Sequence, residues 1–449
     1  MKIALYVHAF FPTSYLGTET HTLTLAKSLR AMGHEPVVVS SIPQGWKKTD
    51  GLITHYDYQD IPVYCIDKNY IPRSSLRETY YQPQMRQIHK DLLQEYRPDI
   101  IHVTHLFNHT AALLDAAQDL DIPAVATFTD FFGFCINYKL EAANGSLCPG
   151  PNPQRTNCLA CCAKIRVRQV NSTLSENSLN RLAPLFQLGS ILFNWVHKLP
   201  VLRRSELSAH LRDIKERPGL LAKYYGLYRA AIAPTRFLRS AYERNGVTSA
   251  PIHQINFGVD LDRKPKQTPP SSVPIRFGFI GQIAPHKGTA LLVEAFCRLP
   301  PGKSELHIYG AETQFPSYTH AMKERCTNLP VFFRGTFPTG QMRQILDGMD
   351  FLVIPSTWYE NSPLVLLDAL ASHTPVIVSD VEGLTEFLEP GKNGYAFARG
   401  SVDDLERVLR QILATPESSR QLSITTNYSK ATLSMTEEVV KIYNSIITK

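Results

Sequence analysis

The feature that most constrains the fold of this chain is a regular alternation of short apolar runs with helical patterns, which occurs twice. The first series opens with an apolar run at 2–8 and a helical pattern that ends near residue 32. The second series begins at residue 275, after a stretch at 263–274 that is rich in Lys, Pro and Ser and typical of a linker. Strands that alternate with helices form parallel sheets covered by helices on both faces. The sequence therefore predicts two doubly wound α/β domains.

These patterns give the expected domain organisation of the 449-residue chain. We expect an N-terminal domain at 1–262, a linker at 263–274, and a second domain at 275–432. Residues 433–449 form a helical pattern that we expect to pack back on the first domain. The first series is interrupted at about 131–217 by a stretch with five cysteines and then an apolar, basic segment, which we interpret as an insertion.

The formal charge of +7 is concentrated in one region. Residues 164–217 carry ten Lys or Arg against four Asp or Glu, and no nucleic-acid reader motif accompanies them. We therefore expect no nucleic-acid partner. The apolar run at the N-terminus is too short for a signal peptide, and no run of about 18 apolar residues suggests a spanning helix. The sequence thus predicts a cytoplasmic protein whose membrane contact, if any, is peripheral.

The stretch 358–371 follows a strand-like run and contains two carboxylates eight residues apart, Glu360 and Asp368. Asn361 and Ser362 are favourable N-cap residues, and Pro363 is favoured at the first helical position. We therefore expect a strand, a loop and a helix whose free N–H groups can meet phosphate. The alternative is a capped core helix with two surface acids.

Two glycine-containing loops also follow predicted strands. Gly17-Thr18-Glu19 precedes the first helix, where a glycine lets backbone approach a ligand, although a plain turn is the alternative. In the loop 281–288, Lys287 stands just before a helix, which is unfavourable for the helix dipole unless an anion binds there. A solvated surface lysine is the alternative. Neither G-x-G-x-x-G nor G-x-x-x-x-G-K-[ST] occurs, so nicotinamide and ATPase chemistry are not supported.

Six motifs occur along the chain in a fixed order. They are Gly-Thr-Glu followed by Leu-Ala-Lys-Ser-Leu-Arg-Ala-Met-Gly-His, then Ala-Pro-Thr-Arg-Phe, Asn-Phe-Gly-Val-Asp, Gly-Gln-Ile-Ala-Pro-His-Lys-Gly, Glu-Asn-Ser-Pro-Leu-Val-Leu-Leu-Asp-Ala, and Gly-Lys-Asn-Gly. Together they closely resemble family 4 of the glycosyltransferases, retaining enzymes of the GT-B fold that use nucleotide-sugar donors. The resemblance covers nearly the whole chain apart from about 166–220. It implies two Rossmann-like domains that face each other across a cleft.

The resemblance also implies roles for individual residues. Lys287 would bind the donor diphosphate, Glu360 would contact the donor sugar near the reacting carbon, and Asp368 would accept hydrogen bonds from the ribose. Lys287 and Glu360 are therefore the catalytic candidates. Such an enzyme gains rate by positioning and charge stabilisation and requires no metal or other cofactor. The expected donor-binding set is Gly17, Gln282, Lys287, Glu360, Asn361, Ser362, Pro363, Leu364, Val365 and Asp368.

Three positions depart from the family pattern. Asp368 stands where the family usually has Glu, and Gln282 stands where Arg is common, which removes one cation from the phosphate site. Thr129 precedes Asp130 where many members have His. Either this imidazole has no counterpart here, or another histidine near a strand end replaces it, although a structural role is the favoured interpretation of each such histidine. The histidines concerned are His8, His102 and His105, and we take His8, Thr129 and Asp130 as the acceptor-side candidates.

The insertion contains the cysteines Cys135, Cys148, Cys158, Cys161 and Cys162. Cys158 and Cys161 form a C-x-x-C pair, and with Cys135 and Cys148 they could make a structural four-thiolate zinc site. The alternative is a set of free buried thiols in a loop that shapes the acceptor side, since disulfides are disfavoured in the cytosol.

The segment 181–204 is apolar, contains Trp195, and carries Arg181 near its start and Lys198, Arg203 and Arg204 near its end. Apolar residues with Trp and flanking cations are typical of a helix that lies on anionic lipid. The alternative is a helix packed on the N-terminal domain or at a dimer contact.

We therefore expect a retaining glycosyltransferase that moves a sugar from a nucleotide-sugar donor to a glycan, lipid-linked or small-molecule acceptor. The alternatives are a non-catalytic GT-B protein that binds nucleotide sugar or glycan, and a nucleotide-sugar epimerase or phosphorylase of the same fold. The presence of both Lys287 and the two carboxylates favours an enzyme.

Overall fold

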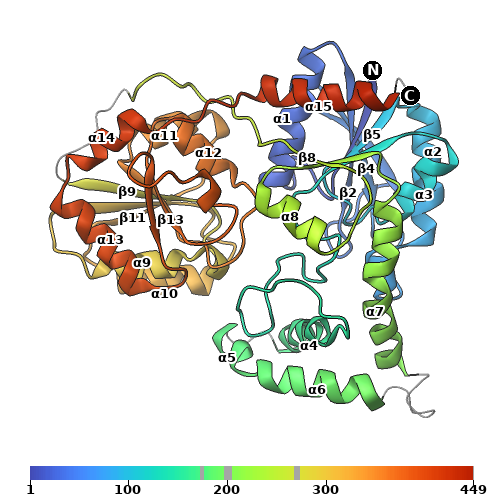
Figure 1. Ribbon diagram of the computed structural model, residues 1–449, viewed down its shortest axis with the longest axis horizontal. Helices are drawn as coiled ribbons and strands as arrows, with labels where there is room; N and C mark the ends of the chain where they lie inside the picture. Colours follow the sequence, from blue (N-terminus) through green and yellow to red (C-terminus); the bar gives the residue numbers. More distant parts are fainter. Residues whose placement is uncertain (172–175, 197–204, 267–273, 448–449) are drawn as a thin grey trace. The chain divides into compact units, whose positions relative to one another are not determined.

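The computed structural model describes residues 1–171, 176–196, 205–266 and 274–447 (Figure 1). The chain divides into two compact units, which we call unit 1 and unit 2. Unit 1 comprises Met1–Ile255 and Met435–Lys449, and unit 2 comprises Asn256–Ser434.

The division between the units falls before the predicted domain end at residue 262. The Arg263 guanidinium donates hydrogen bonds to the carbonyls of Val259, Tyr428 and Lys430, and the Tyr428 hydroxyl donates to the carbonyl of Phe257. These bonds attach the start of the predicted linker to unit 2. Residues 267–273 of that linker lie outside the described residues.

Unit 1 contains an eight-stranded sheet in the order β3-β4-β2-β1-β5-β6-β7-β8. All neighbouring strands are parallel except β3 and β4, a hairpin whose turn residues Gln59 and Asp60 have positive φ. The strands are β1 (Lys2–Tyr6), β2 (Glu35–Ile42), β3 (Ile53–Tyr58), β4 (Ile61–Asp67), β5 (Ile100–Val103), β6 (Ala124–Thr127), β7 (Ala230–Ala233) and β8 (Ile252–Gln254).

Helices pack around this sheet, and the C-terminal helix is one of them. In α15 (Thr432–Ile447), the buried Tyr443 hydroxyl lies 2.5 Å from Nδ1 of His102 on β5. Residues 448–449 lie outside the described residues. The other helices next to the sheet are α1 (Gly17–Ala31), η1 (Arg77–Thr79), α2 (Pro83–Tyr96), α3 (Ala112–Asp119) and α8 (Arg236–Arg244).

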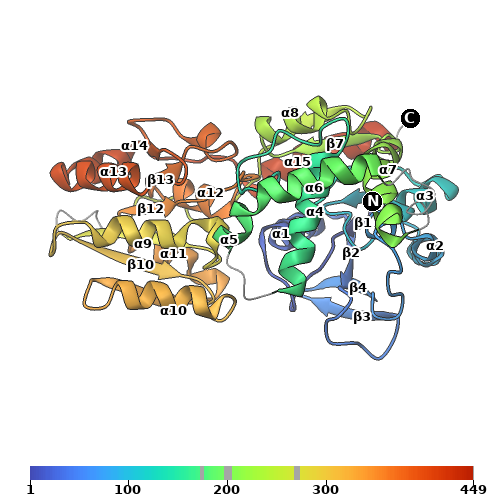
Figure 2. The same cartoon turned by 90° about the horizontal axis from the view of Figure 1, so that it is seen from below.

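The predicted insertion is mostly helical (Figures 1 and 2). It contains α4 (Thr156–Val170), α5 (Glu176–Arg181), α6 (Ala183–Val196) and the first part of α7 (Glu206–Tyr225). Helix α7 is capped by Ser205, whose hydroxyl oxygen accepts from the Ser208 N–H. It runs across residue 217, the predicted end of the insertion, and ends at Tyr225.

Unit 2 contains a six-stranded parallel sheet in the order β11-β10-β9-β12-β13-β14, with helices on both faces (Figure 1). Its strands are β9 (Ile275–Ile280), β10 (Ser304–Tyr309), β11 (Val331–Gly335), β12 (Phe351–Ile354), β13 (Val376–Ser379) and β14 (Gly394–Phe397). Its helices are η2 (Pro285–Lys287), α9 (Thr289–Cys297), α10 (Pro316–Arg325), η3 (Thr339–Gln341), α11 (Met342–Asp347), α12 (Leu364–Ala371), η4 (Thr385–Phe387), α13 (Val402–Ala414) and α14 (Ser418–Thr425).

The strand order locates the expected ligand site in each unit. In an open parallel sheet, ligands bind beyond the carboxyl ends of the strands, where the chain reverses its direction of winding. This switch point lies between β1 and β5 in unit 1 and between β9 and β12 in unit 2. We therefore expect binding and catalytic residues in the loops that follow these four strands.

No helix in the described ranges is long and apolar enough to cross a membrane.

Candidate active site

At the switch point of unit 2, the loop after β9 packs directly against the end of β12. Gly288 follows the short helix η2 with φ +70°, and a Cβ there would lie 1.9 Å from the carbonyl oxygen of Pro355. Only glycine permits this approach, because any side chain would force the two loops apart. The approach brings Lys287, one residue earlier, beside the loop that follows β12.

Lys287 and Glu360 form an ion pair in which Nζ lies 2.6 Å from Oε1. The same oxygen accepts hydrogen bonds from Ser356 Oγ at 2.5 Å and from Trp358 Nε1 at 3.0 Å. The Lys287 ammonium also lies 5.0 Å from the centre of the Trp358 ring, a cation–π contact. The side chain of Glu360 is 8% exposed and that of Lys287 is 22% exposed. Three donors therefore hold one carboxylate oxygen at the edge of solvent.

The backbone of Glu360 is held by the loop after β13. Its N–H donates to the carbonyl of Glu382 at 3.3 Å. Gly383, with φ +83°, passes so close that a Cβ would lie 1.6 Å from the carbonyl oxygen of Glu360. Both the side chain and the backbone of this residue are thus fixed before any ligand binds.

The N-terminus of α12 differs from the prediction by one residue. The N-cap residue is Pro363, with extended backbone, and α12 begins at Leu364, so neither Asn361 nor Ser362 is the cap and Pro363 is not the first helical residue. Ser362 adopts φ +61°, which turns the chain before the helix. No side chain in the described part of the chain caps α12. The first N–H groups of this helix, those of Leu364 and Val365, are therefore open to an anion.

Ser362 supports the same conclusion. Its side chain is 2% exposed, and its Oγ has no hydrogen-bond partner among the described residues. Buried polar atoms are nearly always paired, so an orphaned hydroxyl at a helix start is a place for a ligand atom or water.

Asp368 lies within α12 and is half-buried. Burial raises the pKa of its carboxyl to about 7, and the nearby Asp260 carboxylate adds to the effect. Gln282, in the loop after β9, is also half-buried. Nine of the ten residues expected to bind the donor lie in unit 2, and the tenth, Gly17, lies in unit 1.

At the switch point of unit 1, two histidines lie side by side. The rings of His8, after β1, and His105, after β5, are 4.3 Å apart between centroids. His8 Nε2 lies 3.5 Å from Glu19 Oε1, and His105 Nε2 lies 2.8 Å from Asp130 Oδ2. Ser14 donates to the same Glu19 oxygen at 2.6 Å. The sequence-predicted residues His8 and Asp130 are thus joined through His105.

Burial disfavours the charged forms of two groups in this cluster, His8 and Glu19. It lowers the pKa of His8 well below 6.5, and the neighbouring His105 and His109 lower it further. Burial also raises the pKa of Glu19, which is fully buried. The second carboxyl oxygen of Glu19 has no partner among the described residues. Glu19 is a candidate that the sequence reasoning did not single out, although it belongs to the Gly-Thr-Glu motif.

Three other residues that the sequence indicates as candidates do not belong to either of these two clusters. Gly17 is the first residue of α1 and not part of a loop, and a Cβ there would meet nothing within 4 Å. The Thr129 hydroxyl donates to the carbonyl of Thr104 at 2.9 Å, a bond that ties together the loops after β5 and β6. His102 is buried between Tyr443 and Thr127, which is a structural position.

The cysteines of the insertion are free thiols in this structure. Burial raises the pKa of Cys158 to about 12, with smaller contributions from Cys135, Cys162 and Cys148. The Cys161 thiol donates to the carbonyl of Glu141 at 3.6 Å. No group of three or more potential ligands in the described ranges is arranged to hold a metal ion. The zinc site therefore stays a prediction.

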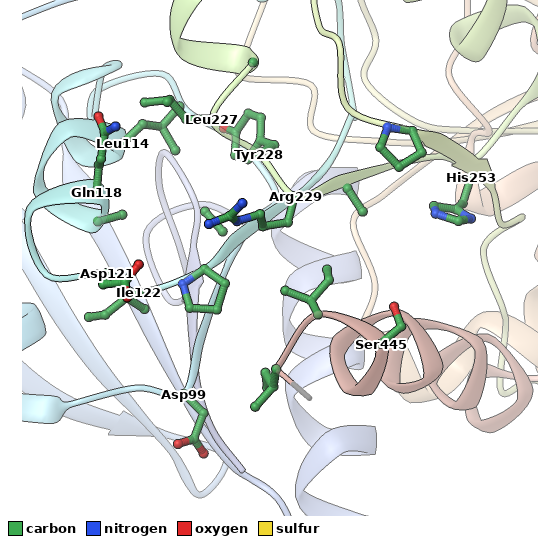
Figure 3. A pocket seen from close by; sticks show the side chains of 18 residues that line it. Asp99, Leu114, Gln118, Asp121, Ile122, Leu227, Tyr228, Arg229, His253 and Ser445 are labelled. Carbon is green, nitrogen blue, oxygen red and sulfur yellow. The ribbon is translucent and has the colours of Figure 1, made fainter. Parts of the chain in front are cut away.

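A separate cavity of about 840 Å³ lies in unit 1, at the amino ends of the strands (Figure 3). Asp99, Pro123, Arg229 and Pro251 on its wall directly precede β5, β6, β7 and β8, and residues 445–447 of α15 complete it. This edge is opposite to the one where ligands bind in such sheets. The cavity is therefore not part of the candidate active site.

Comparisons with known families match both units. Residues 261–427 match the family described as "Glycosyl transferases group 1", and residues 15–143 match the family described as "Glycosyltransferase Family 4". The first match contains Lys287, Glu360 and Asp368, and the second contains Glu19, His105 and Asp130.

Curated relatives are similar over part of the chain. Alpha-maltose-1-phosphate synthase of Mycolicibacterium smegmatis is 29% identical over 179 residues, which cover 37% of this chain and 43% of that protein. Poly(ribitol-phosphate) alpha-N-acetylglucosaminyltransferase of Staphylococcus aureus is also 29% identical over 179 residues, covering 37% of this chain and 35% of that protein. The matched stretch thus spans less than half the length of either relative.

Solved structures match the fold of the whole chain. Sucrose-phosphate synthase from Thermosynechococcus elongatus has a TM-score of 0.64 and 16% identity, covering 100% of this chain and 99% of that one. HepE of Anabaena, in complex with UDP-glucose, has a TM-score of 0.63 and 15% identity, covering 99% and 100%. At these identities the likeness concerns the fold, which is GT-B: two α/β units, each with a mainly parallel sheet.

Proposed function

Because the chain belongs to the group 1 glycosyltransferases, we propose that it is a retaining enzyme that transfers a sugar from a nucleotide-sugar donor to an acceptor. The observation that carries this proposal is the Lys287–Glu360 pair at the switch point of unit 2, next to an uncapped helix. A fixed cation, a fixed carboxylate and free N–H groups are what a diphosphate-linked sugar requires.

In this proposal, Lys287 binds the donor diphosphate and balances the charge that develops on it as the sugar leaves. Glu360 keeps its bonds to Ser356 and Trp358 when Lys287 turns to phosphate, and its carboxylate faces the positive charge that develops at the reacting carbon. The N–H groups of Leu364 and Val365 bind phosphate oxygen, and Asp368 accepts from the ribose. The solved complexes of Anabaena HepE with UDP and UDP-glucose support a nucleotide-sugar donor.

On the acceptor side, we propose that His8, His105 and Asp130 contact the acceptor, which is a glycan, a lipid-linked glycan or a small molecule, and that the buried Glu19 positions His8. Imidazole and carboxyl groups can form hydrogen bonds with sugar hydroxyls. Thr129 acts indirectly by positioning the loop. We also propose a cytoplasmic location with peripheral membrane contact through 181–204. The reaction requires no cofactor, and the cysteines of the insertion hold a structural zinc ion. Metal analysis of anaerobically purified protein tests the zinc site.

The test is a panel of UDP-, GDP- and ADP-sugars with and without mixed acceptors, read by nucleotide release. We expect one donor to release nucleotide only when an acceptor is present, with retention of the anomeric configuration in the product. Binding without any acceptor-dependent release would identify a non-catalytic binding protein. Product formation without an acceptor, or only with phosphate, would identify an epimerase or a phosphorylase.

A further inference from the structure

Helix α6 is apolar on both of its faces. Among its 14 residues there is no charged side chain, and its sequence is APLFQLGSILFNWV. A helix that is hydrophobic all round is normally buried on all sides. In Figure 1, however, α6 lies at the edge of unit 1, with α4 between it and the sheet, and Figure 2 shows it from the exposed side.

One face of α6 is packed within the insertion. Ala183 belongs to a buried cluster with Ala160 and Cys161 of α4, and Phe186 packs against it. Phe193 packs against a second cluster, which contains Leu159 of α4 and Leu211 and Ile214 of α7. Ser190, on the same face, is 6% exposed. The spacing of 183, 186, 190 and 193 is that of one helical face. This packing fixes which side of α6 turns outward.

The outward face is a continuous apolar stripe. Its large side chains are far more exposed than those of a packed helix: Leu185 64%, Leu188 56%, Ile191 46%, Leu192 57%, Trp195 74% and Val196 38%. Helix α4 also carries two exposed apolar side chains of its own, Ile165 at 40% and Val170 at 83%. A contiguous exposed patch of this kind marks an interaction surface.

The charges around the stripe identify the kind of partner. Residues 164–204 contain seven Lys or Arg and a single acid, Glu176. Among the described residues, Arg166, Arg168 and Arg181 are exposed. Residues 197–204, with Lys198, Arg203 and Arg204, lie outside the described residues. Lys164 is buried and donates to Asn180, so the placed surface charges are these three arginines of α4 and α5. Exposed arginines next to an apolar face favour an anionic partner over a neutral surface.

We infer that the α4–α6 surface docks unit 1 on an anionic lipid bilayer, with α6 lying in the plane of the interface. The stripe of Leu and Ile side chains enters the acyl boundary, Trp195 lies at the headgroup level, and the arginines meet lipid phosphate. Fourteen residues of helix are about 21 Å long, less than the ~30 Å of a hydrocarbon core, so α6 rests on the membrane without crossing it. The inference deepens the peripheral contact of the proposed function but is independent of the donor site.

The test uses co-sedimentation of the full chain with vesicles of phosphatidylcholine alone or mixed with phosphatidylglycerol. We expect binding to the anionic vesicles only, weakening as NaCl rises from 50 to 500 mM. The double variant Leu188→Glu/Leu192→Glu should bind about 100-fold more weakly, because two buried Leu side chains are lost. Ile424→Glu is the matched control, since Ile424 is 75% exposed on α14 of unit 2 and should bind as the wild type does.

Trp195 gives a second readout. Anionic vesicles should shift the tryptophan emission to the blue, and Trp195→Phe should abolish the shift while the protein still sediments with the vesicles. Donor-induced thermal stabilisation should be the same in all variants, which separates this inference from the donor site. Equal vesicle binding by the double variant would overturn the inference. A second result would also overturn it: a wild type that does not bind vesicles and is a dimer in solution, while the double variant is a monomer. The stripe would then be a contact between two copies of the protein.

Discussion

The switch points of the two units are built alike but charged differently. In unit 2 the loops after β9 and β12 join a lysine to a carboxylate at 2.6 Å. In unit 1 the equivalent loops after β1 and β5 join two imidazole rings at 4.3 Å, beside a buried Glu19 with a raised pKa. One sheet architecture thus presents a lysine–carboxylate ion pair in one unit and a cluster of histidine and carboxyl side chains in the other.

This difference indicates a division of labour. A charged diphosphate needs a fixed cation and free N–H groups, which unit 2 supplies at Lys287 and α12. Under the proposed function, sugar hydroxyls need hydrogen-bond donors and acceptors, which unit 1 offers at His8, His105 and Asp130. Mutations in the two clusters should therefore affect different substrates, and that contrast can be tested.

The largest effect is expected from Glu360→Gln. The amide keeps the shape and can still accept from Ser356 and Trp358, but the negative charge beside the reacting carbon is lost. We expect turnover to fall about 100-fold or more while donor binding persists, because Lys287 is left unpaired for phosphate. Glu389→Gln is the control, since Glu389 forms an exposed pair with Lys392 in the same unit. Full activity in Glu360→Gln would remove this residue from the mechanism.

A smaller effect is expected from His105→Asn in unit 1. The change removes the ring that contacts His8 and bonds Asp130, so the acceptor site loses its alignment. We expect the KM for the acceptor to rise about tenfold, the order of one lost hydrogen bond to a charged group. The donor-induced thermal shift should not change, and the exposed His55→Asn should behave as the wild type. Loss of donor binding in His105→Asn would contradict the division of labour.

The smallest effect concerns the pH dependence of stability at Asp368. Its folded pKa of about 7 lies above the usual 3.8 of an unfolded Asp, so the folded state holds the proton more tightly. Folding stability is thus fully present below pH 4, falls as the pH rises to about 7, and stays reduced above that. Asp368→Asn should unfold about 5 °C higher than the wild type at pH 8, with little difference at pH 4. The exposed Asp380→Asn should show no such trend; a difference independent of pH would contradict the assignment.

Much of the fold follows from patterns in the sequence. Buried strands such as Phe351–Ile354 are short apolar runs that alternate with amphipathic helices. The structure keeps this pattern because a strand that is covered by helices on both faces must be apolar. The sequence patterns do not predict the β3–β4 hairpin. Strand β3 (ITHYDY) has no buried residue and no apolar run, and β4, although mostly buried, contains Pro62, which weakens a strand pattern. The predicted cap of α12 lies one residue too early, because Ser362 takes a positive φ that the pattern of cap residues does not predict.

The site was predictable only in part. Lys287 and Glu360 were found because they belong to motifs, but Ser356 and Trp358 carry no motif, and their bonds to Glu360 depend on how the loop after β12 folds. The contact of His105 with Asp130 joins residues 25 positions apart, in the loops that follow the neighbouring strands β5 and β6. Such a pair becomes visible only once the strand order is known.

The most direct test of the central claim is a comparison of donor binding by the wild type, Lys287→Ala and Lys392→Ala, using thermal shifts with UDP-, GDP- and ADP-sugars. Lys392 is the matched control because it also pairs with a glutamate in unit 2 but lies on the surface. We predict that one donor stabilises the wild type and Lys392→Ala equally and has no effect on Lys287→Ala. Equal stabilisation of all three proteins would show that the Lys287–Glu360 pair is not the donor site.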